Sequence, residues 1–164
     1  ENLSTEDPLT GLLNRRTFTE ILERKIKLQT ENQDFHGILA YIDLDNFKLI
    51  NDQMGHQTGD EVLIIISNQL KDLVNTNDLV ARLGGDEFAI WFDRISAGDV
   101  EKVLSPINQN QSLFSKFSPD PSRPFSLSIG KAEVKGSANE TLSQIIAKAD
   151  AAMYVHKRSK KQNQ

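Results

Sequence analysis

The sequence predicts an α/β (α+β) fold in which helices flank a central, mainly antiparallel sheet. Apolar runs lie on both sides of Gly84-Gly85. Two glycines between apolar runs are typical of a β-hairpin, because glycine tolerates the positive φ angles of tight turns. Segments with apolar residues at helical spacing come before and after this hairpin. One sheet with helices packed on it is the simplest architecture that buries these faces.

The expected elements follow one another as helix, strand, two helices, two strands, helix, strand and helix. The segments expected to be helical are residues 15–30, 46–53, 59–73, 97–104 and 142–153. The segments expected to be strands are residues 38–43, 79–81, 88–92 and 125–130. Pro106 is expected to end or kink the helix before it, because proline lacks a backbone N–H.

The composition is that of an ordinary soluble domain, with 38% hydrophobic and 26% charged residues. The 164 residues are about the length of one domain. A net charge of −4 argues against double-stranded nucleic acid as a partner. The absence of cysteine excludes disulfides and cysteine-ligated zinc, and it fits a cytoplasmic location.

The chain is expected to be a piece of a larger protein, because it opens on Glu1 rather than on methionine. We interpret residues 1–6 as the end of an upstream helical linker, residues 7–161 as one domain and residues 162–164 as a tail. No apolar run approaches the roughly 18 residues that would span a bilayer. An upstream sensor or membrane module is compatible with this chain, so membrane anchoring of the full protein stays open.

Two acidic clusters stand where strands are expected to end or turn. Asp43 and Asp45 follow the first expected strand, and Asp86 and Glu87 follow the paired glycines. If the strand neighbours the hairpin, Asp43 and Asp86 could share one Mg²⁺, which takes one or two carboxylates besides phosphate oxygens and water. The alternative is that Asp43 and Asp45 only cap the following helix.

A polar, glycine-punctuated segment from Asn51 to Asp60 lies between two expected helices. An amide and a carboxylate can together recognise guanine, because the carboxylate accepts from the N1–H and N2–H donors of the base. Taken alone, Asp60 is more often a helix N-cap, and His56 is more often a turn residue than a ligand.

A set of motifs in fixed order carries a family resemblance. The motifs are Asp7-Pro8-Leu9-Thr10-Gly11-Leu12, Asp43-Leu44-Asp45-Asn46-Phe47-Lys48, Asn51-Asp52 with Gly59-Asp60, and Gly84-Gly85-Asp86-Glu87-Phe88. Together they closely resemble the diguanylate cyclase family of GGDEF domains. The resemblance spans nearly the whole chain and implies a fold similar to adenylyl cyclase catalytic domains and polymerase palms. It implies that two GTP molecules become cyclic di-GMP and two pyrophosphates.

The resemblance also implies roles for individual residues. The implied ligands of Mg²⁺, with Mn²⁺ as an alternative, are Asp43, the carbonyl of Leu44 and Asp86. Asp86 is the implied general base, and Glu87 is the alternative to it.

The resemblance also implies which residues contact the substrate. Lys48 would stabilise charge on the α-phosphate. The residues implied to bind GTP are Asn51, His56 and Asp60 for the nucleoside, and the amides of Asn46 and Phe47 with Lys157 for the phosphates.

The chain departs from the family pattern at two places. Many relatives carry an Arg-x-x-Asp site that binds the product, and here Asn75 stands in place of the arginine while Asp78 is retained. An asparagine cannot make the bidentate, charged contact of an arginine, so weak or absent product inhibition is expected. Lys161 stands where the family often has an arginine, and it is expected to contact phosphate as a point charge.

The resemblance implies that catalysis needs a homodimer, since one domain binds one GTP and two must face each other. The domain is expected to be the cytoplasmic output unit of a bacterial signalling protein. The alternative is a catalytically quiet GGDEF domain that binds GTP and regulates an attached domain.

Overall fold

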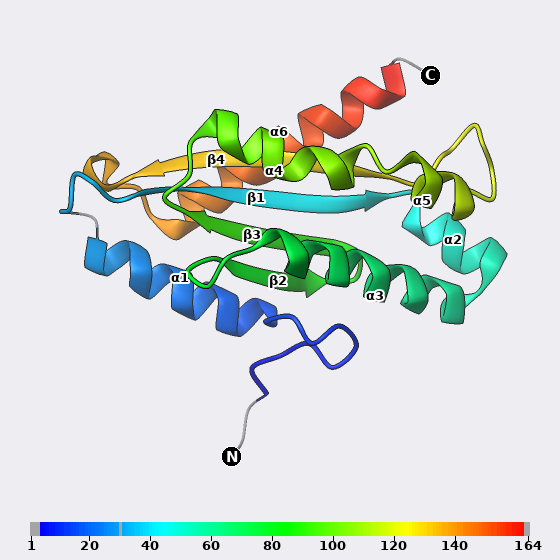
Figure 1. Ribbon diagram of the computed structural model, residues 1–164, viewed down its shortest axis with the longest axis horizontal. Helices are drawn as coiled ribbons and strands as arrows, with labels where there is room; N and C mark the ends of the chain where they lie inside the picture. Colours follow the sequence, from blue (N-terminus) through cyan, green and yellow to red (C-terminus); the bar gives the residue numbers. More distant parts are fainter. Residues whose placement is uncertain (1–3, 30, 163–164) are drawn as a thin grey trace.

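In the part of the chain that the structure describes, residues 4–29 and 31–162, four strands form one sheet in the order β2-β3-β1-β4 (Figure 1). The strands of this computed structural model are β1 (His36–Asp45), β2 (Leu79–Gly84), β3 (Glu87–Asp93) and β4 (Ser126–Lys135). Every strand pair is antiparallel. β1 is central, and all of its residues after His36 are buried. The predicted fold class is therefore confirmed.

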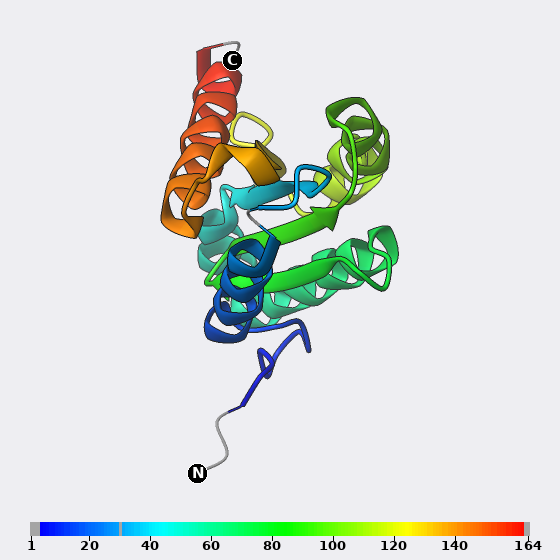
Figure 2. The same ribbon diagram turned by 90° about the vertical axis from the view of Figure 1, so that its left-hand side faces the viewer.

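Helices cover both faces of this sheet (Figure 2). The helices are α1 (Arg15–Gln29) and α6 (Leu142–Gln162) on one face, and α2 (Phe47–Met54), α3 (His56–Leu73), α4 (Ala97–Asn108) and α5 (Gln111–Lys116) on the other. Successive side chains of β1 point to opposite faces. Ile38 and Ile42 therefore join the core under α3 and α4, while Leu39 and Tyr41 join the core under α1 and α6.

Several helices have bounds that differ from the sequence prediction: α2 is shifted by one residue, α6 continues to Gln162, and α3 and α4 also differ. α3 begins at His56 rather than at Gly59. Its first two residues are exposed and bury no apolar side chain, so no apolar periodicity marked this turn. Pro106 was expected to end or kink the preceding helix, and the first of these alternatives is wrong, because α4 continues to Asn108. Proline removes the hydrogen bond to only one carbonyl, and the buried Leu104 and Ile107 keep this last turn packed on the core.

Other elements were missed or are longer than expected. The short helix α5 was not predicted, and β4 continues to Lys135, five residues beyond the expected end at Gly130. Residue 30, the expected end of the first helix, lies outside the described residues, and α1 ends at Gln29.

The N-terminal segment lies against the edge strand β2. Leu13 pairs in parallel with Ala81, and an Nη1 atom of Arg82 lies 3.2 Å from Oδ1 of Asp7. Residues 4–6 are not helical, and residues 1–3 and 163–164, which include parts of the expected linker and tail, lie outside the described residues. Within the described ranges, no helix is both long enough and apolar enough to cross a membrane.

Candidate active site

The hairpin between β2 and β3 brings its acidic tip against the end of β1. Gly84 and Gly85 have φ angles of 153° and 38°, so the turn needs the conformational freedom of glycine. The turn residues are Gly85 and Asp86, and Glu87 already begins β3. The backbone N–H of Leu44 donates to the carbonyl of Asp86 at 3.1 Å. The predicted contact between the first strand and the hairpin is therefore present.

Arg82 stabilises this turn by a hydrogen bond to its backbone. Nη2 of Arg82 donates to the carbonyl of Gly85 at 2.8 Å, while Nη1 contacts both carboxylate oxygens of Asp7. Asp7 also accepts hydrogen bonds from the N–H and the hydroxyl of Thr10. The N-terminal motif and the acidic turn are thus linked through one partly buried guanidinium group.

Three carboxylates meet at the carboxyl end of β1. Asp43 lies directly opposite Glu87 in the β1–β3 register, so both side chains point to the α6 face of the sheet. Burial raises the pKa of Asp43, and the neighbouring charges of Asp45 and Glu87 add to the effect of burial. Burial and the charge of Asp43 likewise raise the pKa of Asp86. The site therefore holds negative charge that a cation would stabilise.

The donor set at this point consists of oxygen atoms. It comprises Asp43, Asp86 and the carbonyl of Leu44, which points toward the hairpin because the N–H and C=O of one strand residue share a side. Hard divalent cations prefer such ligands, so the residues fit Mg²⁺ or Mn²⁺. Within residues 4–29 and 31–162, no three histidine, cysteine, aspartate or glutamate side chains gather as a metal site of their own. Any metal here would need the carbonyl, water or substrate oxygens.

A lysine from α6 contacts the same site. Nζ of Lys157 donates to Oδ2 of Asp43 at 2.5 Å. Burial lowers the pKa of Lys157, but the hydrogen bond and the charge of Asp43 outweigh this and raise the pKa above its ordinary value. The lysine is therefore charged at neutral pH and supplies a positive charge beside the carboxylates.

Glu87 contacts two other residues, Tyr41 of β1 and Arg15 of α1. The hydroxyl of Tyr41 donates to Oε2 of Glu87 at 2.7 Å, and Nη2 of Arg15 lies 3.8 Å from the same oxygen. Burial and the contact with Glu87 raise the pKa of Tyr41 to about 12. Tyr41 therefore stays a hydrogen-bond donor to Glu87.

Asp45 does not cap a helix. Its carboxylate accepts hydrogen bonds from the hydroxyls of Ser126 and Ser128, each at 2.7 Å, and from Nζ of Lys160 at 2.9 Å. The N-cap of α2 is Asn46, which has a left-handed backbone and makes no side-chain cap. The alternative that Asp43 and Asp45 only cap the next helix is therefore wrong.

A basic pocket opens beside these carboxylates. Its volume is about 260 Å³. The side chains that line it include Asp45, Asn46, Arg123, Lys157, Lys160 and Lys161. Four cationic residues around one buried carboxylate suit a polyanionic ligand, and the first N–H groups of α2 begin next to Asn46.

The residues predicted to contact the nucleoside lie on α2 and α3. A Cβ atom on Gly59 would come within 1.9 Å of Oδ1 of Asn51, so the absence of a side chain lets Asn51 lie on the first turns of α3. Asp60 lies inside α3, exposed, and the N-cap of α3 is Gly55, so the N-cap alternative for Asp60 is wrong. His56 begins α3, and its side chain is exposed.

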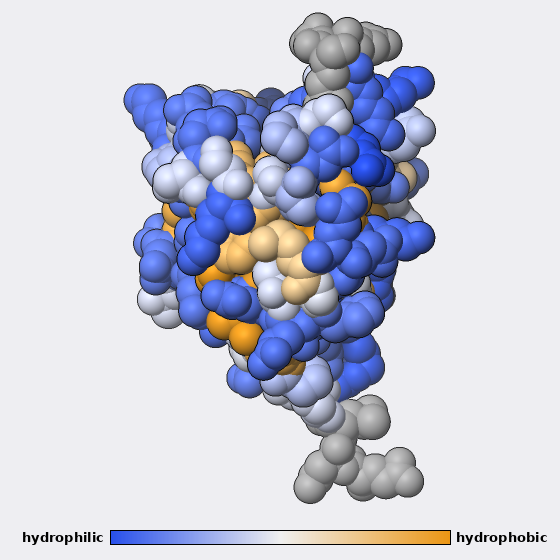
Figure 3. Space-filling view, turned by 90° about the vertical axis from the view of Figure 1, so that its right-hand side faces the viewer, coloured by the Kyte–Doolittle hydropathy of each residue, from blue (hydrophilic) through white to orange (hydrophobic). Residues whose placement is uncertain are grey.

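This end of the molecule also carries Lys48, whose exposed side chain stands on α2. The surface seen from the side on which α2 and α5 lie has an apolar area framed by hydrophilic residues (Figure 3). Met54, the last residue of α2, is one of the exposed large apolar side chains.

Comparison with known proteins agrees with this geometry. The family model described as "Diguanylate cyclase, GGDEF domain" matches residues 4–163. This chain belongs to the GGDEF domain family of diguanylate cyclases. The domain is 37% identical over 153 residues to the diguanylate cyclase TpbB of Pseudomonas aeruginosa, covering 93% of this chain and 35% of TpbB. It is 36% identical to the diguanylate cyclase DgcP of Escherichia coli, covering 96% of this chain and 46% of DgcP.

The fold of this GGDEF domain also matches solved structures. The GGDEF domain of DgcB from Caulobacter crescentus, solved with c-di-GMP, superposes with a TM-score of 0.78 at 32% identity, covering 97% of this chain and 93% of that one. Diguanylate cyclase SiaD of Pseudomonas aeruginosa, solved with its activator SiaC, superposes with a TM-score of 0.80 at 32% identity, covering 95% and 59%. The domain thus spans about a third to a half of the curated relatives named above.

Asp78, which the resemblance compared with the aspartate of a product-binding site, makes two hydrogen bonds within this GGDEF domain. Oδ2 of Asp78 accepts the backbone N–H of Asn75 at 2.9 Å, and Oδ1 accepts the backbone N–H of Asp93 at 2.8 Å. Both carboxylate oxygens are therefore engaged in holding the turn before β2 against β3.

Several residues of the GGDEF site were missed by sequence reasoning. They are Lys160, Arg123 and the two serines that bind Asp45, and also Tyr41, which holds Glu87. A signal was present for the serines, because Ser126 and Ser128 alternate on one face of a predicted strand, as Asp43 and Asp45 do. Lys160 follows Lys157 at helical spacing, so it too could have been suspected.

Proposed function

We propose that this GGDEF domain condenses two GTP molecules into cyclic di-GMP and releases two pyrophosphates. The observation that supports this most directly is the convergence of Asp43, the Leu44 carbonyl, Asp86 and Lys157 at the end of β1. A cation bound to these oxygens, Mg²⁺ in the first instance and Mn²⁺ as the alternative, would lower the pKa of the attacking hydroxyl and neutralise phosphate charge.

In the proposed reaction, the 3′-oxygen of each GTP bonds to the α-phosphorus of the other, and in each case the bond from that phosphorus to the oxygen bridging to the β-phosphate breaks. One pyrophosphate leaves at each step, and each hydroxyl proton passes to the Asp86 of the domain that binds the attacking GTP. Among the contacts of this turn within the described residues, no other side chain donates a hydrogen bond to the Asp86 carboxylate. Glu87, the alternative base, already accepts hydrogen bonds from Tyr41. We therefore favour Asp86.

The substrate would be held at both of its ends. The amides of Asn46 and Phe47, with Lys157 and Lys161, would bind the phosphates, since the lining of the basic pocket includes three of these residues. Lys48 would meet the charge that develops on the α-phosphate. The apolar area beside α2 suits a flat base, and His56 would contact the nucleoside.

We expect Asp60 to determine the choice of guanine over adenine. Asp60→Ala should lower kcat/KM for GTP by about 100-fold, because a charged acceptor for two N–H donors is lost. It should change kcat/KM for ATP little, since adenine offers no such donor pair. Glu61→Ala, an exposed acid one residue away, is the matched control and should behave as wild type. Equal use of ATP and GTP by the wild-type domain would contradict this role.

We expect product inhibition through the Asn75–Asp78 segment to be weak. The arginine that would grip the product is absent, and the Asp78 carboxylate already accepts two backbone N–H groups. Isothermal titration with cyclic di-GMP should show no site of micromolar affinity there. Micromolar binding that is lost in an Asp78→Ala variant, with folding retained, would refute the expectation.

We infer that the active unit is a homodimer within a longer cytoplasmic signalling protein, which carries an upstream sensor or membrane module. The decisive experiment fuses the domain to a dimeric coiled coil and incubates it with GTP and Mg²⁺. Formation of cyclic di-GMP, followed by chromatography, supports the proposal. GTP binding without turnover in the forced dimer would favour the alternative, a quiet domain that regulates its neighbour.

A further inference from the structure

The C-terminal helix α6 changes the way it is attached to the sheet near Met153. Up to that point its buried stripe is apolar, with Leu142, Ile145, Ala149 and Met153 in the core. At the next positions of the same stripe stand His156 and Lys160. Beyond Met153, polar side chains of α6 contact the sheet: His156, Lys160 and, between them, Lys157, which reaches Asp43.

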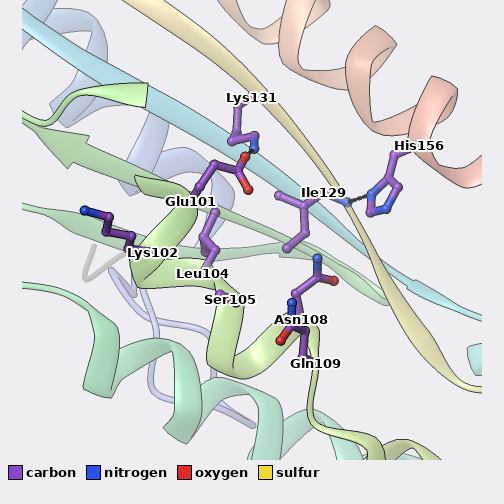
Figure 4. A pocket seen from close by; sticks show the side chains of 9 residues that line it. All are labelled: Glu101, Lys102, Leu104, Ser105, Asn108, Gln109, Ile129, Lys131 and His156. Carbon is purple, nitrogen blue, oxygen red and sulfur yellow. Dashed lines mark hydrogen bonds and ion pairs between the residues drawn. The ribbon is translucent and has the colours of Figure 1, made fainter. Parts of the chain in front are cut away.

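One of these contacts is made by a histidine. The backbone N–H of Ile129 donates to Nδ1 of His156 at 3.0 Å (Figure 4). Ile129 lies on β4, an edge strand of the sheet in the described part of the chain, and its N–H points toward α6 rather than toward β1. Nδ1 can accept only in the neutral ring, in which the other nitrogen carries the proton.

The ring of His156 is half-buried and lies at the border of a pocket of about 480 Å³ between α4, β4 and α6 (Figure 4). Burial lowers the pKa of His156, and the nearby charges of Lys160 and Lys131 lower it further, against an opposing effect of Asp45. Across the pocket, Glu101 of α4 forms an ion pair with Lys131. The environment as a whole disfavours the protonated ring.

Lys160 makes the second contact between the last turns of α6 and the sheet. Nζ of Lys160 donates to Asp45 and to the backbone carbonyl of Leu127, two residues before Ile129 on β4. His156 and Lys160 are one helical turn apart and therefore hold α6 along the same strand edge. Lys157 lies between His156 and Lys160 in the sequence, and its Nζ contacts Asp43, the second acid at the end of β1.

We propose that His156 is a positioning residue whose neutral ring fastens the end of α6 to β4 and thereby holds Lys157 at the nucleotide site. The inference rests on the proposed function only in that GTP is the ligand. Protonation removes the acceptor for the Ile129 N–H and places a second positive charge beside Lys160. The last turns of α6 then detach, and Lys157 loses its fixed position.

The direction of the pH effect follows from the lowered pKa. The pKa of His156 in the folded protein lies below its unfolded value of 6.5, so the neutral ring stabilises the folded state. The hydrogen bond between the Ile129 N–H and His156 is therefore fully formed above pH 6.5. It weakens as the pH falls below the unfolded value and through the folded pKa.

The test compares GTP affinity of the whole domain between pH 7.5 and pH 5.5 in wild type and in His156→Gln. Glutamine can accept from the Ile129 N–H and does not titrate, so the variant should match wild type at pH 7.5 and bind about three- to tenfold more tightly than wild type at pH 5.5. The pH dependence of GTP itself, and of every group present in both proteins, cancels in this ratio. The matched control is His36→Gln, an exposed histidine at the start of β1, which should track wild type at both values.

A second variant and a second readout make the outcome decisive. His156→Ala should bind GTP more weakly than wild type at pH 7.5 by a similar factor, with a flatter pH profile. The amide proton of Ile129, followed by NMR without nucleotide, should shift with the titration of His156. Wild-type and His156→Gln affinities that fall in parallel, or an Ile129 amide that does not respond, would overturn the inference. Failure of the wild-type domain to bind GTP at all would instead refute the proposed function, and the amide titration would still judge the role of His156.

Discussion

Asp86→Asn will abolish cyclic di-GMP formation, with kcat/KM lowered by about 10³-fold or more. The substitution keeps the shape of the side chain but removes the proposed base and one of the two carboxylates of the proposed metal site. Steady-state formation of cyclic di-GMP from GTP in the forced dimer measures the effect.

We expect the Asp86→Asn variant to fold, so that its loss of activity reports on the chemistry and not on unfolding. Burial and the Asp43 charge raise the pKa of Asp86, so the ionised group destabilises the fold at neutral pH. Asparagine removes that charge, and the melting temperature should stay level or rise. The matched control is Asp72→Asn, an exposed acid on α3, which should retain full activity. An Asp86→Asn variant with a tenth of wild-type activity would show that another group accepts the proton.

Gly130→Ala will destabilise the domain by about 3 kcal/mol and inactivate it. A Cβ atom at this position would lie 2.0 Å from the carbonyl oxygen of Ala149 and 2.1 Å from the backbone nitrogen of Met153. Both neighbours are helix backbone and cannot rotate away, so α6 must move as a unit. Lys157 moves with it, because it stands one turn beyond Met153. Urea denaturation and GTP binding measure the two consequences.

Gly98→Ala is the matched control for this prediction. No atom lies within 4 Å of a Cβ placed on Gly98, which stands in the first turn of α4. Alanine has the higher helix propensity, so this variant should be unchanged or more stable by up to about 1 kcal/mol. If both glycine variants unfold at the same urea concentration, α6 does not rest on β4 as closely as the structure has it.

Much of the fold was predictable because it depends on local patterns. Gly84-Gly85 between two apolar runs predicted the hairpin, and the stripe from Leu142 to Met153 predicted the last helix. Two of the errors fall where no local apolar pattern marks the element. The first turn of α3 buries no apolar side chain at its start, and the proline in α4 sits where the helix loses one hydrogen bond but keeps its core contacts.

The sequence by itself determined the family and the antiparallel sheet with its acidic hairpin, and it predicted Asp43, Leu44, Asp86 and Lys157 of the proposed site. These are encoded in residue type and spacing along the chain. Only the tertiary structure decided what each side chain contacts. The sequence left open whether Asp45 only caps the following helix. Its partners in the structure, Ser126, Ser128 and Lys160, lie more than 80 residues away along the chain. Strand register and the docking of α6 bring these groups together, and neither leaves a local signal near Asp45.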